Sequence, residues 1–195
     1  MVTVPLRELA SVRMGLTLRG REATRPDPAG TCWLVQIGDI DDHGGLSDAA
    51  LLPFTPGVAV KEGHFLKPGD VLVPNRGTRC VAAVFDRPER TVLAGSQFLI
   101  VRPEGGRLVP SFLAWYLSSP SATAHLNEFR CGSVVPTLPR GALESLVIPL
   151  PSLAKQSAVA ALHALAVREQ NLRAEISRLR ATLVQQQLLS TLTTP

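Results

Sequence analysis

The chain has 195 residues, of which 45% are hydrophobic and 18% are charged, and its formal net charge is +4. This composition is typical of a folded core and excludes a disordered tail. No stretch approaches the roughly 20 apolar residues of a membrane span, and the first residues lack the pattern of a signal peptide, so we expect a cytoplasmic protein. The three cysteines lie far apart, which predicts neither a disulfide framework nor a metal site.

Arginine supplies most of the positive charge. Only Lys61, Lys67 and Lys155 are lysines, so 17 of the 20 basic residues are arginines. The codons of a GC-rich genome produce such a preference on a solvated surface. Phosphate and guanine recognition also favours arginine, because the planar guanidinium binds both through paired hydrogen bonds. Composition alone leaves both explanations open.

The first part of the chain is rich in turns and short apolar runs. Proline and glycine are frequent up to residue 151 and are then absent until Pro195. Strand-like runs occur at residues 33–37, 71–73, 80–85, 91–93 and 98–101, and turn clusters separate them. Residues 110–119 and 121–129 have the pattern of short helices. We therefore predict an α+β fold, with a β-rich domain over residues 1–151.

The second part predicts one long helix over residues 152–191. Its apolar positions follow a heptad register that Glu169 interrupts. They are Leu162, Leu165, Leu172, Ile176, Leu179 and Leu183. A helix of about 35–40 residues extends ~50–60 Å, which is longer than one such domain can cover. The apolar stripe therefore predicts a coiled coil, formed either with a second copy of the chain or with a helix of a different protein.

The motifs of common enzymes are missing from the sequence. It contains no P-loop, no H-E-x-x-H, no G-x-S-x-G and no glycine-rich dinucleotide fingerprint. We therefore predict that the chain is not an enzyme and uses no cofactor. The alternative is a site assembled from dispersed residues such as His64, Asp70 and Cys80, although nothing in the sequence places them together.

Three segments are candidates for nucleic-acid binding. Loop 74–79 lies between two predicted strands and holds residue types that read purine edges and phosphates, namely Asn75, Arg76, Thr78 and Arg79. An ordinary hairpin turn is the alternative for this loop. The second segment is a basic arm that would reach phosphate, with Arg13, Arg19, Arg21 and Arg25. The third is loop 129–137, which offers Arg130, Ser133 and Thr137.

Five segments carry a resemblance to a known family. They are residues 6–17, 33–40, 67–73, 132–138 and 146–156, and the last is proline-rich and runs into the long helix. In this order they resemble one half of a DNA-specificity (S) subunit of type I restriction-modification systems, over essentially the whole chain. The proline-rich segment is the most specific of the five. It departs from the family at Lys155, where a glutamate usually precedes the glutamine.

The resemblance implies a target-recognition domain that reads a short DNA sequence, and a helix that sets the spacing to a second such domain. Family members usually carry two domains and two helices, whereas this chain has the pattern of one of each. An antiparallel homodimer would supply the second half and would read two inverted half-sites. The implied partners are double-stranded DNA, a second copy of the chain, and the methyltransferase (M) and restriction (R) subunits, which would carry the catalysis.

A scaffold or adaptor protein is the alternative function. Residues 31–60 contain four aspartates and no basic residue, and residues 111–150 are neutral overall. A domain with this charge distribution could bind a protein rather than DNA, with the helix serving as a coiled-coil scaffold. Binding to DNA at low salt distinguishes the two hypotheses.

Overall fold

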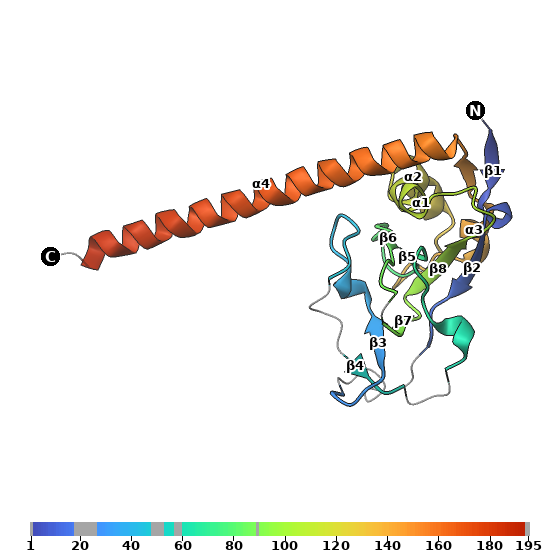
Figure 1. Cartoon of the computed structure of the whole chain (residues 1–195), viewed down its shortest axis with the longest axis horizontal. Helices are drawn as coiled ribbons and strands as arrows, with labels where there is room; N and C mark the ends of the chain where they lie inside the picture. Colours follow the sequence, from blue (N-terminus) through green and yellow to red (C-terminus); the bar gives the residue numbers. More distant parts are fainter. Residues whose placement is uncertain (1, 18–26, 48–52, 57–59, 89, 194–195) are drawn as a thin grey trace. The chain divides into compact units, whose positions relative to one another are not determined.

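The computed structural model describes residues 2–17, 27–47, 53–56, 60–88 and 90–193. The chain divides into two compact units, Met1–Ser157 and Ala158–Pro195. The first unit is an α+β domain rich in strands, and one long helix runs through the second (Figure 1). The predicted fold class is therefore confirmed. Among the helices of the described ranges, none is long and apolar enough to cross a membrane.

Short strands build the first unit. Those that the structure describes are β1 (Thr3–Pro5), β2 (Ala10–Met14), β3 (Cys32–Val35), β4 (Pro53–Phe54), β5 (Val71–Pro74), β6 (Ala83–Val84), β7 (Val92–Ala94), β8 (Phe98–Pro103) and β9 (Val147–Pro149). They form three sheets, with the orders β1-β9, β2-β8-β5-β6 and β4-β3-β7. All pairings are antiparallel except that of β3 with β7.

The strands that were predicted from apolar runs lie close to their expected positions. β3, β5, β7 and β8 overlap four of these runs, whereas the run 80–85 forms only the two residues of β6. β3 ends at Val35 because the chain turns into a 3-10 helix at Ile37–Asp39, which the Asp39 carboxylate stabilises by accepting from Gln36 N at 2.7 Å. Strands β1, β2, β4 and β9 were not predicted. β1, β4 and β9 have only two or three residues with a proline and show no periodicity. Ala10–Met14, which forms β2, was not among the apolar runs, and its Arg13 was assigned to a basic arm.

The core lies between the four-stranded and the three-stranded sheets. β5 and β8 contribute Leu72, Phe98 and Ile100, and β3 and β7 contribute Val35 and Val92 among others. All of these side chains are fully buried. Burying an aliphatic or aromatic side chain contributes about 1.5–3 kcal/mol, so this layer fixes the position of β5 and of the loop that follows it.

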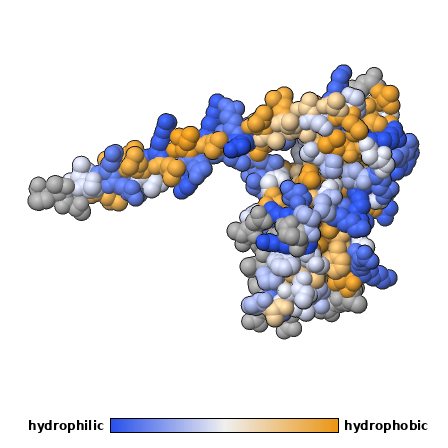
Figure 2. All heavy atoms as spheres, viewed as in Figure 1, coloured by the Kyte–Doolittle hydropathy of each residue, from blue (hydrophilic) through white to orange (hydrophobic). Residues whose placement is uncertain are grey.

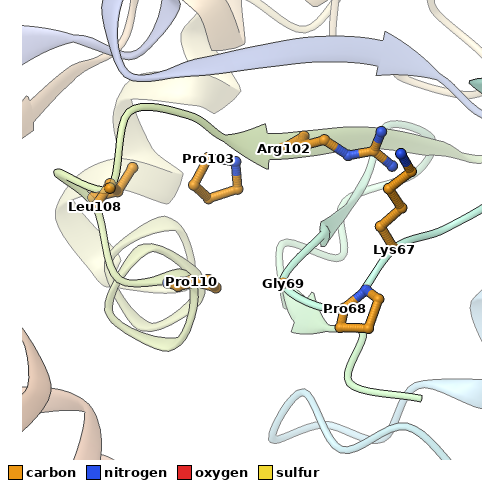
Figure 3. A pocket seen from close by; sticks show the side chains of 8 residues that line it. Lys67, Pro68, Gly69, Arg102, Pro103, Leu108 and Pro110 are labelled. Carbon is orange, nitrogen blue, oxygen red and sulfur yellow. The ribbon is translucent and has the colours of Figure 1, made fainter. Parts of the chain in front are cut away.

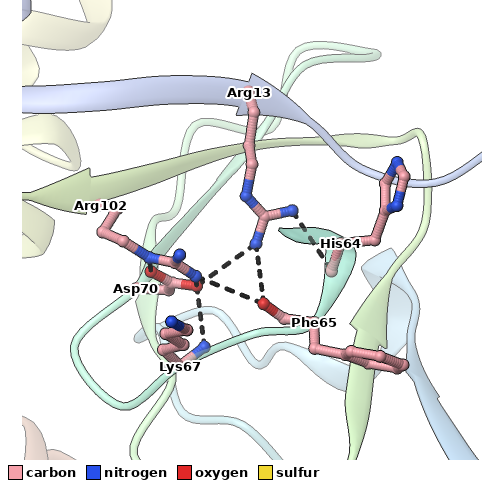
Figure 4. A network of polar contacts seen from close by, with 6 residues as sticks. All are labelled: Arg13, His64, Phe65, Lys67, Asp70 and Arg102. Carbon is pink, nitrogen blue, oxygen red and sulfur yellow. Dashed lines mark hydrogen bonds and ion pairs between the residues drawn. The ribbon is translucent and has the colours of Figure 1, made fainter. Parts of the chain in front are cut away.

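A buried carboxylate joins three segments of the four-stranded sheet (Figure 4). Asp70, only 1% exposed, accepts from Arg102 Nε and Nη2 at 2.6 Å each and from Lys67 N at 2.9 Å. Arg13 Nη2 of β2 lies 3.5 Å from the same carboxylate. The hydrogen bond to Asp70 raises the pKa of Arg102, whereas burial lowers the pKa of Arg13 against the opposing attraction of Asp70. β2, β8 and the turn before β5 are thereby held together.

Three short helices and the start of the long one complete the first unit. They are α1 (Pro110–Leu117), α2 (Pro120–Glu128), α3 (Arg140–Ser145) and α4 (Leu153–Thr193), with 3-10 turns at Leu6–Glu8 and Glu62–His64. The predicted helices at 110–119, 121–129 and 152–191 are thus confirmed. α1 and α2 both begin with a proline, whose missing N–H costs nothing at that position. Ser119 caps α2 by accepting from Ala122 N.

Gln156 connects the first turn of α4 to the rest of the domain. Its side chain is completely buried. Its Oε1 accepts from Val109 N at 2.8 Å, and its Nε2 donates to Arg107 O at 3.0 Å and to Pro151 O at 2.9 Å. The side-chain amide of Gln156 therefore satisfies the backbone N–H of Val109, just before α1, and two backbone carbonyl oxygens. Its neighbour Lys155 is exposed, so the departure from the family at that position removes none of these contacts.

We expect Gln156→Glu to destabilise the first unit by about 3 kcal/mol. The substitution keeps the shape but replaces the donor with an oxygen that faces two carbonyl oxygens in a buried site. Urea unfolding followed by fluorescence reports on this unit, because both tryptophans of the chain, Trp33 and Trp115, belong to it. Lys155→Glu is the matched control and should change stability by less than about 0.5 kcal/mol. Equal stability of the two variants would contradict the role given to Gln156.

Candidate nucleic-acid interface

Two of the predicted loops form one continuous surface. Gly77 N donates to Pro136 O at 2.9 Å, and Leu138 N donates to Asn75 O at 2.7 Å. Arg76 and Thr137 are paired as an isolated bridge between the loops. We call residues 74–79 and 129–138 the two-loop surface. The sequence presented these segments as separate weak candidates, about 55 residues apart in the chain, and β5 and α2 bring them together.

Arg130 holds the two-loop surface together from within. Its Nη1 donates to Gly77 O at 2.8 Å and to Asn75 O at 3.4 Å. Its Nε donates to Asn127 Oδ1 at 2.9 Å, and its Nη2 lies 3.3 Å from Cys80 Sγ. The guanidinium is therefore directed at protein atoms on all sides. This geometry makes Arg130 a residue that positions the loop 75–79, and its predicted contact with DNA stays a prediction.

The other candidates of these loops differ in exposure. Arg76, Thr78 and Ser133 are exposed, and Thr137 is half-buried. The side chain of Arg76 makes no hydrogen bond or ion pair with any other residue that the structure describes. Arg76 is therefore the arginine of this surface whose donors are available to a ligand.

Asn75 and Arg79 are bound to the protein itself. Asn75 is 1% exposed, and its Nδ2 donates to Ser96 O at 3.2 Å. Arg79 donates to Ile37 O at 3.0 Å and Ile40 O at 2.6 Å, and it pairs with Asp42 at 3.2 Å. In this arrangement both side chains support the loop and present few donors to a ligand.

The predicted basic arm is described at only one of its arginines. Arg13 donates to His64 O at 3.2 Å and to Phe65 O at 3.1 Å, besides its contact with Asp70 (Figure 4). These bonds anchor β2 to the turn 61–65. Arg19, Arg21 and Arg25 lie outside the described residues, and their contact with phosphate stays a prediction.

A pocket of about 300 Å³ lies beside α1 and the start of β5 (Figure 3). Its lining consists of Lys67, Pro68, Gly69, Arg102, Pro103, Gly106, Leu108 and Pro110. Arg102 is bound to Asp70, so Lys67 is the lining side chain with a free charge. Lys67 supplies the one amine of this lining, and no carboxylate, imidazole, thiol or hydroxyl side chain lines the pocket beside it.

Of the residues proposed for a dispersed enzyme site, His64 and Asp70 belong to one network, in which Arg13 contacts the backbone oxygen of His64 and the Asp70 carboxylate, and Cys80 belongs to another. Asp70 is bound by two arginines, whereas Cys80 lies against Arg130 and Asn127. Within the described ranges, no group of three or more His, Cys, Asp or Glu side chains is arranged to hold a metal ion. In the acidic turn 39–45, Asp41 stabilises the local backbone, since its Oδ1 accepts hydrogen bonds from His43 N and Gly45 N at 2.8 Å each.

The apolar stripe of α4 is exposed over the length of the helix. Its six predicted members, Leu162, Leu165, Leu172, Ile176, Leu179 and Leu183, are 48–70% exposed. At 3.6 residues per turn they fall within about 100° around the helix axis. Hydrophobic residues are visible along this helix in Figure 2. Glu169, at the break of the heptad register, pairs with Arg173 of the same helix at 2.6 Å.

Sequence reasoning missed the apolar part of the two-loop surface. Phe129, Val134 and Val135 are exposed hydrophobic residues of the second loop. They were not predicted, because the side chains that read base edges and phosphates are mostly polar or basic. The one available signal was a pair of valines in a turn where glycine and polar residues are usual.

The fold of this chain, a β-rich domain followed by one long helix, is similar to parts of solved specificity subunits of type I restriction-modification systems. The HsdS subunit from Thermoanaerobacter tengcongensis matches 86% of this chain, with a TM-score of 0.59 and 19% identity. The S subunit from M. genitalium matches 91%, with a TM-score of 0.58 and 17% identity. A chain from a structure describing complex assembly and conformational transition of the type I R-M system matches 93%, with a TM-score of 0.63 and 19% identity.

These similarities confirm the predicted resemblance at the level of the fold. The chain spans 37%, 42% and 41% of the length of those three chains, respectively. No protein-family model matches the chain, and no curated protein is similar to it in sequence.

We expect Arg130→Ala to loosen the two-loop surface without unfolding the domain. Charge-assisted hydrogen bonds contribute about 1.5–3 kcal/mol each, so the amides of Gly77 and Leu138 should exchange with solvent at least about tenfold faster. Native-state hydrogen exchange measures this directly. Arg76→Ala removes a neighbouring arginine with a free side chain and should leave both amides protected. If Arg130→Ala also leaves them protected, Arg130 does not position the loop.

Proposed function

We propose that this chain is a half-size DNA-specificity subunit of a type I restriction-modification complex, or of a related methylation-based phage-defence complex, in the cytoplasm. The fold similarity to three S subunits over 86–93% of the chain is the observation that carries this proposal. In this role the chain binds double-stranded DNA and performs no catalysis. It directs a methyltransferase (M) subunit, and a restriction (R) subunit where one is present, to the recognised site.

The two-loop surface is the proposed reading surface. Arg76, Thr78 and Ser133 are the predicted residues that reach solvent there. Arginine donates hydrogen bonds to the O6 and N7 acceptors of guanine in the major groove. The hydroxyl groups of threonine and serine form hydrogen bonds with bases or with phosphates. Arg19, Arg21 and Arg25 are proposed to add attraction to phosphate that does not depend on sequence.

The stripe of α4 is proposed to bind a second copy of the chain in an antiparallel coiled coil. Full burial of each leucine or isoleucine contributes about 1.5–3 kcal/mol, and six of them are exposed. An isologous dimer places two identical reading surfaces in inverted orientation, so the recognised DNA is a bipartite palindrome. The length of the helices then sets the spacer between the half-sites.

We expect the purified chain to bind random duplex DNA with a Kd of about 1–100 μM near physiological salt, more tightly at low salt. Arg76→Ala should cost about 1–3 kcal/mol at one base pair and relax the preference there. Arg19→Ala should weaken binding to every sequence and lower the slope of log K against log salt by about one. Fluorescence anisotropy with duplexes at several salt concentrations measures both effects.

Arg168→Ala is the matched control for these variants, because it removes one arginine from the helix instead of the reading surface. It should leave the base preference unchanged. A chain that binds no duplex even at low salt would favour the scaffold or adaptor function. Identical effects of Arg76→Ala and Arg19→Ala would contradict the roles assigned to these two residues.

We expect the chain to be a dimer in solution and Ile176→Asp to dissociate it. A carboxylate on the stripe would be buried in both copies, and association should weaken by at least about a hundredfold, or ~2.8 kcal/mol. Arg178→Asp is the control, since it introduces the same side chain about 160° away on the helix. Sedimentation or light scattering gives the mass. A monomeric wild-type chain at micromolar concentration would rule out the homodimer.

A further inference from the structure

The second loop of the two-loop surface carries an exposed pair of valines at its tip. Val134 is 90% exposed and Val135 is 52% exposed. Cys131 and Thr137 close the loop beneath them through two backbone hydrogen bonds of 3.0 and 2.8 Å. Gly132 has φ +107°, and a Cβ there would approach Val135 O to 3.0 Å, so only glycine suits this turn. We call residues 132–136 the valine tip.

The valine tip is held in a defined position. Pro136 O accepts from Gly77 N at 2.9 Å, which attaches the tip to the first loop. Arg130, the residue before the closing pair, donates to Gly77 O at 2.8 Å from the other side. Val134 is therefore exposed on a turn whose backbone is held by hydrogen bonds. A turn that faced only water would ordinarily carry polar residues or glycine at this place.

The charges around the valine tip indicate the chemistry of its partner. Residues 74–79 and 129–138 contain three arginines and no acidic residue. Arg76 has its side chain free for a ligand, and it belongs to the residue pair Arg76–Thr137 at the base of the tip. An apolar contact framed by positive charge fits a polyanion that displays small apolar groups. Duplex DNA does so in the major groove, where thymine presents its C5-methyl group beside hydrogen-bonding base edges.

We propose that Val134, supported by Val135, determines specificity by contacting the C5-methyl group of a thymine in the major groove, next to the base that Arg76 reads. This inference rests on the proposed DNA-binding function and names one chemical group that the site distinguishes. The discrimination comes from removing the methyl group from water against the valine methyls. One buried methyl corresponds to a factor of about four, and we expect a three- to tenfold effect on Kd.

The test begins with selection of preferred duplexes from a randomised pool by the full-length wild-type chain. Each thymine of the preferred site is then replaced singly by deoxyuridine, which removes only the C5-methyl group and leaves the protein unchanged. We expect one such replacement to raise the Kd of the wild type about three- to tenfold. If no replacement raises it, or the preferred site contains no A·T pair, the proposal is overturned.

A protein variant then assigns the effect to Val134. Val134→Ser removes both methyl groups of the side chain at a solvent-exposed position, so we expect no change in its melting temperature. The variant should bind the thymine and deoxyuridine duplexes with Kd values within about 1.5-fold of each other. Val2→Ser is the matched control, because Val2 is also an exposed valine, and it should retain the full wild-type difference. A Val134→Ser variant as sensitive to the methyl group as the wild type would overturn the proposal.

The outcomes separate this inference from the proposed function. If the wild-type pool shows no enriched sequence, sequence-specific binding fails and the inference fails with it. If a sequence is enriched but its thymine methyl groups are read without Val134, only the inference fails. In that case the valine tip would be free to contact a protein partner.

Discussion

The buried Asp70 carboxylate is the constraint on which the placement of the two-loop surface depends. It is bonded by Arg102 from β8 and by the backbone of Lys67, and Arg13 of β2 approaches it. Removing one partner of a buried ion pair costs about 3–5 kcal/mol because the remaining charge stays unpaired. β5 begins at the next residue, Val71, and ends at Pro74, where the two-loop surface starts. The carboxylate thus fixes the strand that delivers Arg76 to its position.

Arginine has a structural use in this domain that composition did not suggest. Genome composition and nucleic-acid binding were the two explanations considered for 17 arginines. Arg13, Arg79 and Arg130 instead donate to backbone carbonyls of turns and loops. Short strands leave many carbonyls without a partner in a sheet, and a guanidinium with five donors satisfies several at once. Lysine, with one compact ammonium group, would satisfy fewer of them in fixed geometry.

The sequence predicted elements better than it predicted contacts. Runs of apolar residues located β5, β8 and α1, because the core requires them and their periodicity is visible. β1 and β9 pair across almost the whole domain, from Thr3 to Pro149, and no local pattern reports such a partner. The roles within the candidate site had the same limitation. Arg76 and Arg130 look equivalent in sequence, and only the position of the neighbouring carbonyls separates the exposed side chain from the one that holds the loop.

The resemblance to a family contributed what local patterns could not. It joined loop 132–138 to segment 67–73 as parts of one recognition domain, and the structure places their neighbouring residues in contact through Gly77 and Pro136. It also singled out the proline-rich segment before α4 as the most specific of the five similar segments. Gln156 explains that segment physically, since its buried amide requires the chain to arrive at the helix through Pro151 in one conformation.

The break in the apolar stripe bears on how the proposed dimer would measure DNA. Glu169 and Arg173 form an exposed pair on one helix, and burying that pair would cost free energy, so the least costly seam covers residues 172–183. An antiparallel pair with this seam is centred near residue 177. Each residue of shift between the helices changes the separation of their first turns by about 1.5 Å, which is less than half of the 3.4 Å rise of one base pair. A heptad shift therefore changes the spacer by about three base pairs, so the register of the leucines, rather than the length of the helix alone, would determine which spacing is read.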